Sequence, residues 1–191
     1  MKKIFWLLPL FVISCKNDKA ADNGATHDAE GNQTENTETG DSEQAIIDEL
    51  TSNVGRQYTD LEMPTIEGSM AKLSDFVSQN KVTVIDCWAS WCRPCMEEMP
   101  NIAKLYRKYR DLGVGVVGVS FDNDPRAWNN AVKINEMIWP QLGELKGWDN
   151  QMFNVYGVQG IPHTIVINQK GEIIAEGLRG EDLINAVAKA L

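Results

Sequence analysis

Between Lys16 and Gln44 the sequence lacks valine, isoleucine, leucine, methionine and every aromatic residue. A segment of this composition cannot bury enough apolar surface to offset the entropy lost on ordering, so we expect it to be disordered. The N-terminus also lacks a long hydrophobic run, because its apolar stretch Ile4–Ile13 is too short to cross a bilayer as a stop-transfer helix. These absences exclude a packed core before Gln44 and a membrane-spanning helix at the N-terminus.

Positive charge and cysteine are both scarce. The chain of 191 residues has 18 Lys and Arg against 27 Asp and Glu, which gives a formal net charge of −9. This excess of acid argues against binding to nucleic acid and against electrostatic attachment to anionic lipid. The four cysteines, Cys15, Cys87, Cys92 and Cys95, are too few and too clustered for a disulfide-stabilised scaffold.

The N-terminus has the layout of a secretory signal. Lys2 and Lys3 precede the apolar run, whose end, Val-Ile-Ser-Cys at 12–15, resembles a bacterial lipobox. In such a signal the chain is cut before the cysteine, which then carries several acyl chains that anchor it stably in a membrane. We therefore expect a lipoprotein signal peptide at 1–14, a lipidated Cys15 and a disordered acidic tether at 15–44. A conventional signal with an incidental Cys15 is the alternative.

Residues 45–191 show the alternating pattern of an α/β domain. Val82–Cys87 and Val114–Phe121 are continuous apolar runs typical of buried parallel strands, and Met96–Arg110 between them has helical apolar spacing. Asp124-Pro125 indicates the start of a second helix, and Asp149 is expected to cap another short one. Further strands are expected at 164–168 and 172–176 and a final helix at 181–191, which together predict a mixed sheet flanked by helices.

Two cysteines separated by two residues lie at the junction between the first of these strands and its helix. This spacing lets the sulfurs of Cys92 and Cys95 meet within one turn, so a disulfide can close with little backbone movement. Cys92 then lies over the free N–H groups and the positive dipole end of the helix, which favour its thiolate. Arg93 adds a cation beside it, and Pro94 suits the first helical turn.

The segment Trp-Ala-Ser-Trp-Cys-Arg-Pro-Cys at 88–95 resembles the active site of thioredoxin-fold proteins, specifically the TlpA/ResA-like thiol-disulfide oxidoreductases. Trp91 directly before Cys92 and Pro94 directly before Cys95 match that family, and Gly-Ile-Pro-His-Thr at 160–164 resembles its cis-proline loop. The resemblance runs from about Val54 to the C-terminus. It implies a thioredoxin-like fold with an N-terminal β-hairpin extension and an insertion, here 122–154, before the cis-proline loop.

The resemblance implies dithiol–disulfide exchange. Cys92 attacks a substrate disulfide and forms a mixed disulfide, which Cys95 then resolves by attacking Cys92. Two carboxylates are candidates for the base that Cys95 needs. Asp86 stands in the buried strand, where a charge is hard to justify, and resembles the buried aspartate of thioredoxins. Glu98, three residues after Cys95 on the same side of the helix, resembles a glutamate of the ResA-like proteins but is also an ordinary helix-surface residue.

The cis-proline loop is expected to bind substrate. Pro162 should be cis and should face the dithiol, since a cis X–Pro bond persists only where the fold demands it. The family implies that the backbone of Ile161 pairs with the substrate chain as an added strand. We place Trp91 in the same substrate-binding surface. His163 follows the proline and is equally well explained as a loop residue.

The leading hypothesis is a membrane-anchored, extracytoplasmic reductase of protein disulfides, such as those of apocytochromes. The domain would be lipid-anchored in the cell envelope and face the periplasm. Because that compartment is oxidising, the reductase would need a membrane electron donor. We predict no cofactor and no metal.

Four alternatives are weighed at this stage. A disulfide oxidant or isomerase is favoured slightly by Arg93, because a stabilised Cys92 thiolate raises the reduction potential. A copper metallochaperone is a different class, but copper-carrying relatives of this fold typically have three residues between the cysteines, where this chain has two. A peroxiredoxin, similar in fold, has a lone cysteine after a Thr-x-x motif, which Trp-Cys-Arg-Pro-Cys does not match. A zinc site lacks a second ligand pair.

The remaining candidates are interpreted as core residues. Cys87 alternates with Asp86 along the strand and should point to the opposite face of the sheet, where we expect it to pack rather than react. Trp128, Trp139 and Trp148 could line a substrate groove, but packing within the insertion is the simpler interpretation.

Overall fold

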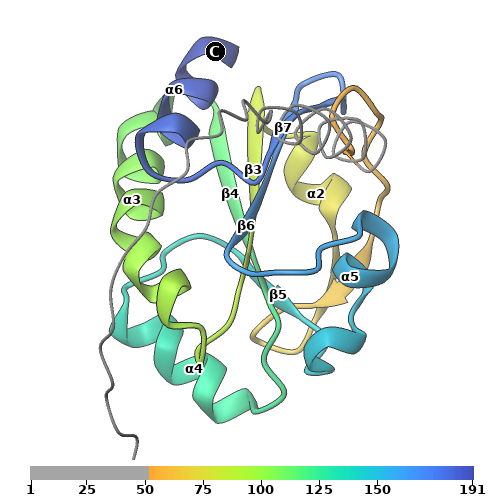
Figure 1. The fold of residues 1–191 in the computed structure, drawn as a ribbon, viewed down its shortest axis with the longest axis vertical. Helices are drawn as coiled ribbons and strands as arrows, with labels where there is room; N and C mark the ends of the chain where they lie inside the picture. Colours follow the sequence, from red (N-terminus) through yellow and green to blue (C-terminus); the bar gives the residue numbers. More distant parts are fainter. Residues whose placement is uncertain (1–51) are drawn as a thin grey trace, which may run out of the picture.

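The computed structural model describes residues 52–191, whose fold is shown in Figure 1. The predicted signal peptide at 1–14, the lipidation site Cys15 and the acidic tether at 15–44 lie outside the described residues, so these remain predictions. Within 52–191, no helix is long and apolar enough to cross a membrane.

A five-stranded mixed sheet forms the centre of the domain, in the spatial order β5-β4-β3-β6-β7. The first three strands in sequence pair in parallel and the last two pair antiparallel. β3 is central, and all seven of its residues are buried, which explains its continuous apolar sequence. The strands are β3 (Val82–Trp88), β4 (Val114–Ser120), β5 (Gln141–Gly143), β6 (His163–Asn168) and β7 (Ile173–Glu176).

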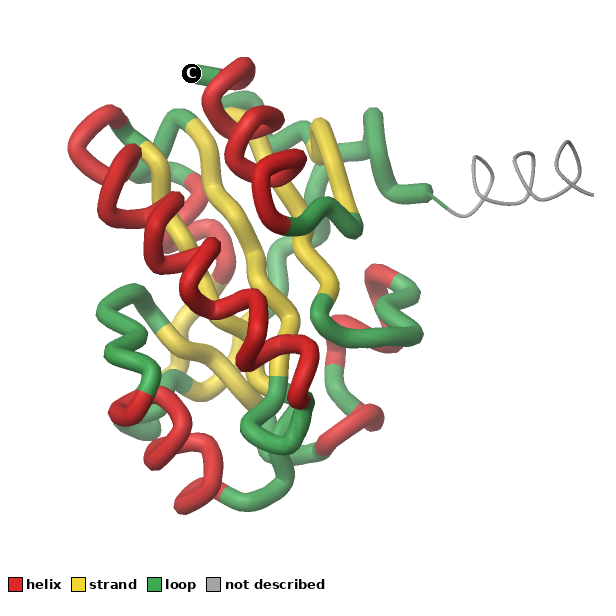
Figure 2. The backbone as a smooth tube through the Cα atoms, turned by 60° about the vertical axis from the view of Figure 1, so that its left-hand side comes forward, coloured by secondary structure: helices red, strands yellow, loops and turns green. Residues whose placement is uncertain are grey.

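Helices cover both faces of the sheet. Figures 1 and 2 show α3, α4 and α6 on one face and α2 and α5 on the other. The α3 helix buries Met99, Ile102 and Leu105, a spacing that places one side of the helix on the sheet. The helices are α2 (Leu73–Val77), α3 (Arg93–Tyr109), α4 (Pro125–Ile134), α5 (Gln151–Tyr156) and α6 (Gly180–Ala190), with single 3-10 turns η1 (Arg110–Leu112) and η2 (Gly147–Asp149).

The predicted N-terminal hairpin is present and protects one edge of the sheet. Its strands, β1 (Glu62–Pro64) and β2 (Met70–Lys72), pair antiparallel. The hairpin then reaches the edge strand β5, where Thr65 bridges to Leu142 and the N–H of Ile66 donates to the carbonyl of Gln141 at 3.1 Å. These contacts occupy backbone groups that an open edge would offer to another chain.

The insertion before the cis-proline loop consists of α4, β5, η2 and α5. Asp124 caps α4 as expected, because its carboxylate accepts the N–H of Arg126 at 2.8 Å. The prediction that Asp149 caps the next helix was wrong by one residue, since Asn150 caps α5. The Asn150 amide oxygen accepts the N–H of Phe153, while its NH2 group donates to the carbonyl of Gly147. A carboxylate could not make the second bond, which explains the preference for asparagine.

Candidate active site

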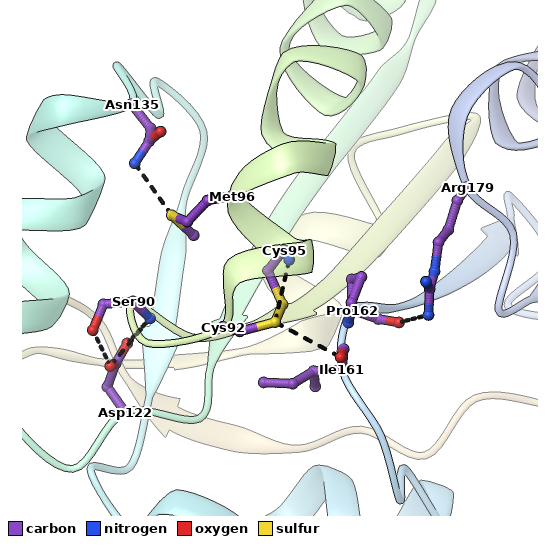
Figure 3. The surroundings of a disulfide bond; sticks show 9 residues. All are labelled: Ser90, Cys92, Cys95, Met96, Asp122, Asn135, Ile161, Pro162 and Arg179. Carbon is purple, nitrogen blue, oxygen red and sulfur yellow. Dashed lines mark hydrogen bonds between the residues drawn. A yellow bond between two sulfur atoms is a disulfide. The ribbon is translucent and has the colours of Figure 1, made fainter.

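The dithiol lies where β3 ends and α3 begins. Cys92 is the N-cap of α3, and its sulfur is bonded to that of Cys95 at 2.03 Å, with their Cα atoms 5.2 Å apart (Figure 3). The N–H of Cys95 points at the Cys92 sulfur from 3.2 Å. Cys92 is 5% exposed whereas Cys95 is fully buried, so the first sulfur is the one that an external thiol or disulfide can approach.

The helix terminus, rather than a cation, dominates the electrostatics around Cys92. Its sulfur receives the Cys95 N–H and lies at the positive end of the α3 dipole, both of which favour a thiolate after reduction. Arg93, expected to add a positive charge, forms an ion pair with Glu97 at 2.9 Å, and both side chains are exposed. Solvent and the paired carboxylate screen this charge, so its effect on the thiol is weak.

The cis-proline loop faces the disulfide. The Ile161–Pro162 bond is cis, as the resemblance implied, and the carbonyl oxygen of Ile161 lies 3.7 Å from the Cys92 sulfur (Figure 3). Since a disulfide sulfur carries no proton, this contact can become a hydrogen bond only when Cys92 is a thiol. Arg179, just before α6, donates from Nη2 to the Pro162 carbonyl at 2.9 Å and so ties the loop to that helix.

Asp122, which follows β4, holds the loop that carries the dithiol. Its carboxylate is buried and accepts the N–H and the hydroxyl of Ser90, the latter at 2.6 Å, together with the hydroxyl of Ser120 at 2.8 Å. Figure 3 shows Ser90 and Asp122 facing each other beside the disulfide. A buried carboxylate with three donors is satisfied in the interior, so Asp122 fixes the backbone two residues before Cys92.

Asp86 lies in the middle of β3 and is fully buried. Neither of its carboxylate oxygens has a hydrogen-bond partner among residues 52–191. Its neighbours across the sheet explain this: Gly118 on β4 has no side chain, and the hydroxyl of Thr164 on β6 donates to the Leu178 carbonyl instead. Burial, helped by the negative charge of Glu98, raises the pKa of Asp86 to about 7.

Glu98, the second predicted base, has a structural task that the sequence did not reveal. Its carboxylate accepts the N–H of Gly180, the first residue of α6, at 2.6 Å and the side-chain amide of Asn101 at 3.0 Å. A carboxylate at a helix N-terminus is favourable, so Glu98 fastens α6 to α3. Both oxygens are therefore engaged, and Asp86 is the better placed of the two acids to take a proton.

Cys87 and His163 flank the site without joining it. Cys87 is buried, and burial together with the charge of Asp86 raises the pKa of its thiol well above the ordinary value, which disfavours the reactive thiolate. His163 begins β6, and burial lowers its pKa. Within residues 52–191 there is no group of three His, Cys, Asp or Glu side chains that could hold a metal ion.

The three tryptophans of the insertion fall into two classes. Trp128 and Trp139 are each 3% exposed, in line with packing. Trp148 is 39% exposed, and its ring lies 6.4 Å from that of Trp91, which is itself 53% exposed. Packing alone therefore does not describe Trp148, which lies beside the residue preceding the reactive cysteine.

Comparison with known proteins agrees with this geometry. The model of the AhpC/TSA family matches residues 54–176, from before the hairpin to the end of β7. The chain belongs to the AhpC/TSA family. Among curated members, the thiol-disulfide oxidoreductase ResA of Bacillus thuringiensis subsp. konkukian is 30% identical over 128 residues, which cover 67% of this chain and 70% of that protein.

Solved structures of thiol-disulfide oxidoreductases also superpose on this chain. The thioredoxin domain of a thiol-disulfide oxidoreductase from Bacteroides vulgatus superposes with a TM-score of 0.66 at 30% identity, covering 71% of this chain and 96% of that one. A thiol:disulfide interchange protein from a Bacteroides species has a TM-score of 0.66 at 29% identity, covering 73% and 90%. The thioredoxin-like fold is thus confirmed, and the protein is a thiol-disulfide oxidoreductase.

Two residues beside the dithiol, Asp122 and Arg179, were missed from the sequence, and Trp148 was named there but interpreted as packing. Asp122 had a usable signal, because an acid directly after a buried parallel strand lies at the edge where the neighbouring strand delivers its loop. Arg179 had no such signal, and the sequence did not separate Trp148 from Trp128 and Trp139, because Arg179 and Trp148 each reach the site through a contact distant in sequence.

Proposed function

We propose that this oxidoreductase works as a reductase of protein disulfides outside the cytoplasm, held at a membrane through lipidated Cys15. The observation that supports it most is the Cys92–Cys95 disulfide beside the cis Pro162 loop, with one sulfur approachable and the other buried. The exposed, paired state of Arg93 supports the reducing direction, because weak stabilisation of the Cys92 thiolate does not favour a strong oxidant.

The exchange transfers two electrons in two steps. The Cys92 thiolate attacks one sulfur of the substrate disulfide, a mixed disulfide forms, and the other substrate sulfur leaves as a thiolate that takes a proton. Cys95 then gives its proton to ionised Asp86, and its sulfur attacks Cys92 to release the second substrate thiol. Asp86 suits this step because its pKa, raised to about 7 by burial, lies near the pH at which it must accept and release a proton.

The proposed roles of Asp86 and of the substrate-binding residues rest on their neighbours in the structure. Cys95 and Glu98 are one turn apart on α3, and the negative charge of Glu98 helps to raise the pKa of Asp86, which supports a position of Asp86 near this part of α3. Ile161 and Pro162 would align an extended substrate segment next to Cys92, and Trp91 would cover it.

The N-terminal sequence supports the location. A signal ending in Val-Ile-Ser-Cys would leave Cys15 as the lipidated first residue, and the acidic segment to Gln44 would lift the domain off the membrane surface. A dithiol donor in the same membrane would return two electrons to the Cys92–Cys95 disulfide after each turnover, and partly folded proteins such as apocytochromes would be the substrates.

The reduction potential of the Cys92–Cys95 pair tests the proposed direction. The domain is equilibrated in thiol redox buffers, and the fraction of disulfide is measured at each buffer ratio. A value near or below about −270 mV, that of thioredoxin, is expected of a reductase supplied from a membrane donor. A value near about −120 mV would contradict the proposal and make disulfide formation the function.

A further inference from the structure

An exposed aromatic cluster lies next to the reactive cysteine. It consists of Trp91, Trp148 and Phe153, which are 53%, 39% and 41% exposed. The ring of Trp148 is 6.4 Å from that of Trp91 and 6.5 Å from that of Phe153. Three large exposed apolar side chains joined through the central ring of Trp148 mark an interaction site rather than scattered exposure.

The cluster is fixed in place before anything binds. Trp148 packs edge-on against Phe121, a fully buried residue directly after β4, with ring centroids 5.1 Å apart. On either side of Trp148, the Glu144 carboxylate accepts the Lys146 ammonium and the N–H of Gln151, both at 2.7 Å. A platform already rigid in the free protein loses little entropy on binding, which favours affinity.

The position of the aromatic cluster indicates that the substrate binds to it. Trp91 directly precedes Cys92, and α5, which carries Phe153, leads into the loop that ends at Ile161 and Pro162. The cluster is therefore continuous with the place where a substrate disulfide must lie. An extended chain advances about 3.3 Å per residue, so side chains two to four residues from the reacting cysteine reach about 7 to 13 Å away.

We propose that this aromatic cluster binds a large apolar side chain of the substrate, two to four residues from the cysteine under attack, and so selects unfolded or partly folded polypeptides. Folded proteins bury such side chains, whereas unfolded segments expose them. This inference rests on the proposed function, because it concerns the substrate that Cys92 attacks. It adds a specificity-determining surface formed by Trp148 and Phe153 to the catalytic pair.

Two disulfide-bridged peptides test the inference. They are identical except that one has tryptophan and the other serine three residues from the cysteine. Protein reduced in advance and freed of reductant is mixed with each peptide, and the single-turnover rate of peptide reduction is measured. We expect the tryptophan peptide to react about tenfold faster, as aromatic contacts of this kind allow.

Variants assign the preference to the cluster. In Trp148→Ala and in Phe153→Ala the ratio of the two rates should fall toward one, and each variant's rate on the serine peptide corrects for general loss. Leu112→Ala, a matched change of a 56% exposed apolar residue in η1, beyond the C-terminal end of α3, should keep the tenfold ratio. If Trp148→Ala proves unfolded by circular dichroism, Phe153→Ala alone decides.

The possible failures are distinguishable. If the wild-type protein reduces neither peptide, the proposed reductase function is wrong. If it reduces both at equal rates, or if the variants keep the tenfold ratio, the function stands and the inference is overturned. If the two rates are equal and Trp148→Ala converts a dimer to a monomer in sedimentation, the cluster instead joins two copies of this chain.

Discussion

Two buried aspartates, Asp86 within β3 and Asp122 just after β4, differ sharply in their hydrogen bonding. Asp122 accepts three hydrogen bonds, from the N–H and hydroxyl of Ser90 and from the hydroxyl of Ser120. Asp86 accepts none from the part of the chain that the structure describes, and burial raises its pKa to about 7. One carboxylate therefore fixes the active-site loop, while the other is the proton acceptor that we propose for Cys95.

The difference in hydrogen bonding follows from where each aspartate lies relative to its strand. Asp122 comes after the last residue of β4, where the neighbouring loop still has a free N–H at Ser90 to offer. Asp86 lies inside β3, where strand pairing already uses the backbone groups on both sides. A buried acid in a strand interior thus depends on side chains for its donors, and Gly118 and Thr164 provide none.

The largest expected effect is on stability when Asp86 is replaced. Because the pKa of Asp86 is about 7 in the folded protein and ordinary when unfolded, the folded state binds the extra proton between these values. Asp86 therefore lowers the free energy of unfolding progressively as the pH rises from about 4 to about 7. Above about pH 7 this loss of stability is constant. Oxidised Asp86→Asn should be more stable than wild type by on the order of 4 kcal/mol at pH 8 and similar to it at pH 4.

Urea unfolding at the two pH values measures this gain. Equal stability of wild type and Asp86→Asn at pH 8 would show that Asp86 carries no buried charge there and would remove the contrast with Asp122.

The next largest effect is a loss of stability on replacing Asp122, in contrast to the gain expected for Asp86→Asn. Asp122→Asn should destabilise the protein by about 2 kcal/mol, because the amide cannot accept all three donors and places its own NH2 group against one of them. The same urea measurement at pH 8 checks it, with Asp124→Asn, an exposed helix cap, as the control. A stabilising effect like that of Asp86→Asn would mean that the two acids are equivalent after all.

The smallest effect concerns Glu98. Glu98→Gln removes the negative charge that helps to raise the pKa of Asp86, so this pKa should fall. It should remain above the ordinary value for aspartate, because burial is the larger cause. The free energy of unfolding should change by less than about 1 kcal/mol, since the glutamine oxygen can still accept the N–H of Gly180. A carbon-13 titration of the Asp86 carboxyl checks the direction, and a rise would contradict it.

Much of the fold could be predicted because its signals are local. The continuous apolar runs at β3 and β4 and the Cys-x-x-Cys between strand and helix each lie within a few residues. The order of helices and strands followed from them, and the disulfide and the cis bond before Pro162 came from short motifs.

The parts that could not be predicted depend on distant partners. Asp122 acquires its role from Ser90, 32 residues earlier, and Glu98 from Gly180, 82 residues later. Trp148 resembles Trp128 and Trp139 in sequence, yet only its ring reaches Trp91. Asp149 and Asn150 are adjacent helix-capping residues, and the choice between them rested on the carbonyl of Gly147, which only the fold positions.

The most direct test of the proton-transfer role is the pH dependence of the second chemical step. A mixed disulfide is formed between Cys92 and a chromophoric aromatic thiol, and the release of that thiol by Cys95 is timed from pH 5 to pH 9. In the wild-type protein the rate should rise with pH and level off above about 7, where Asp86 is ionised. In Asp86→Asn the rate at pH 7 should be about a hundredfold lower, and the plateau near pH 7 should be lost. An unchanged profile in the variant would contradict the assignment of Asp86 as the proton acceptor.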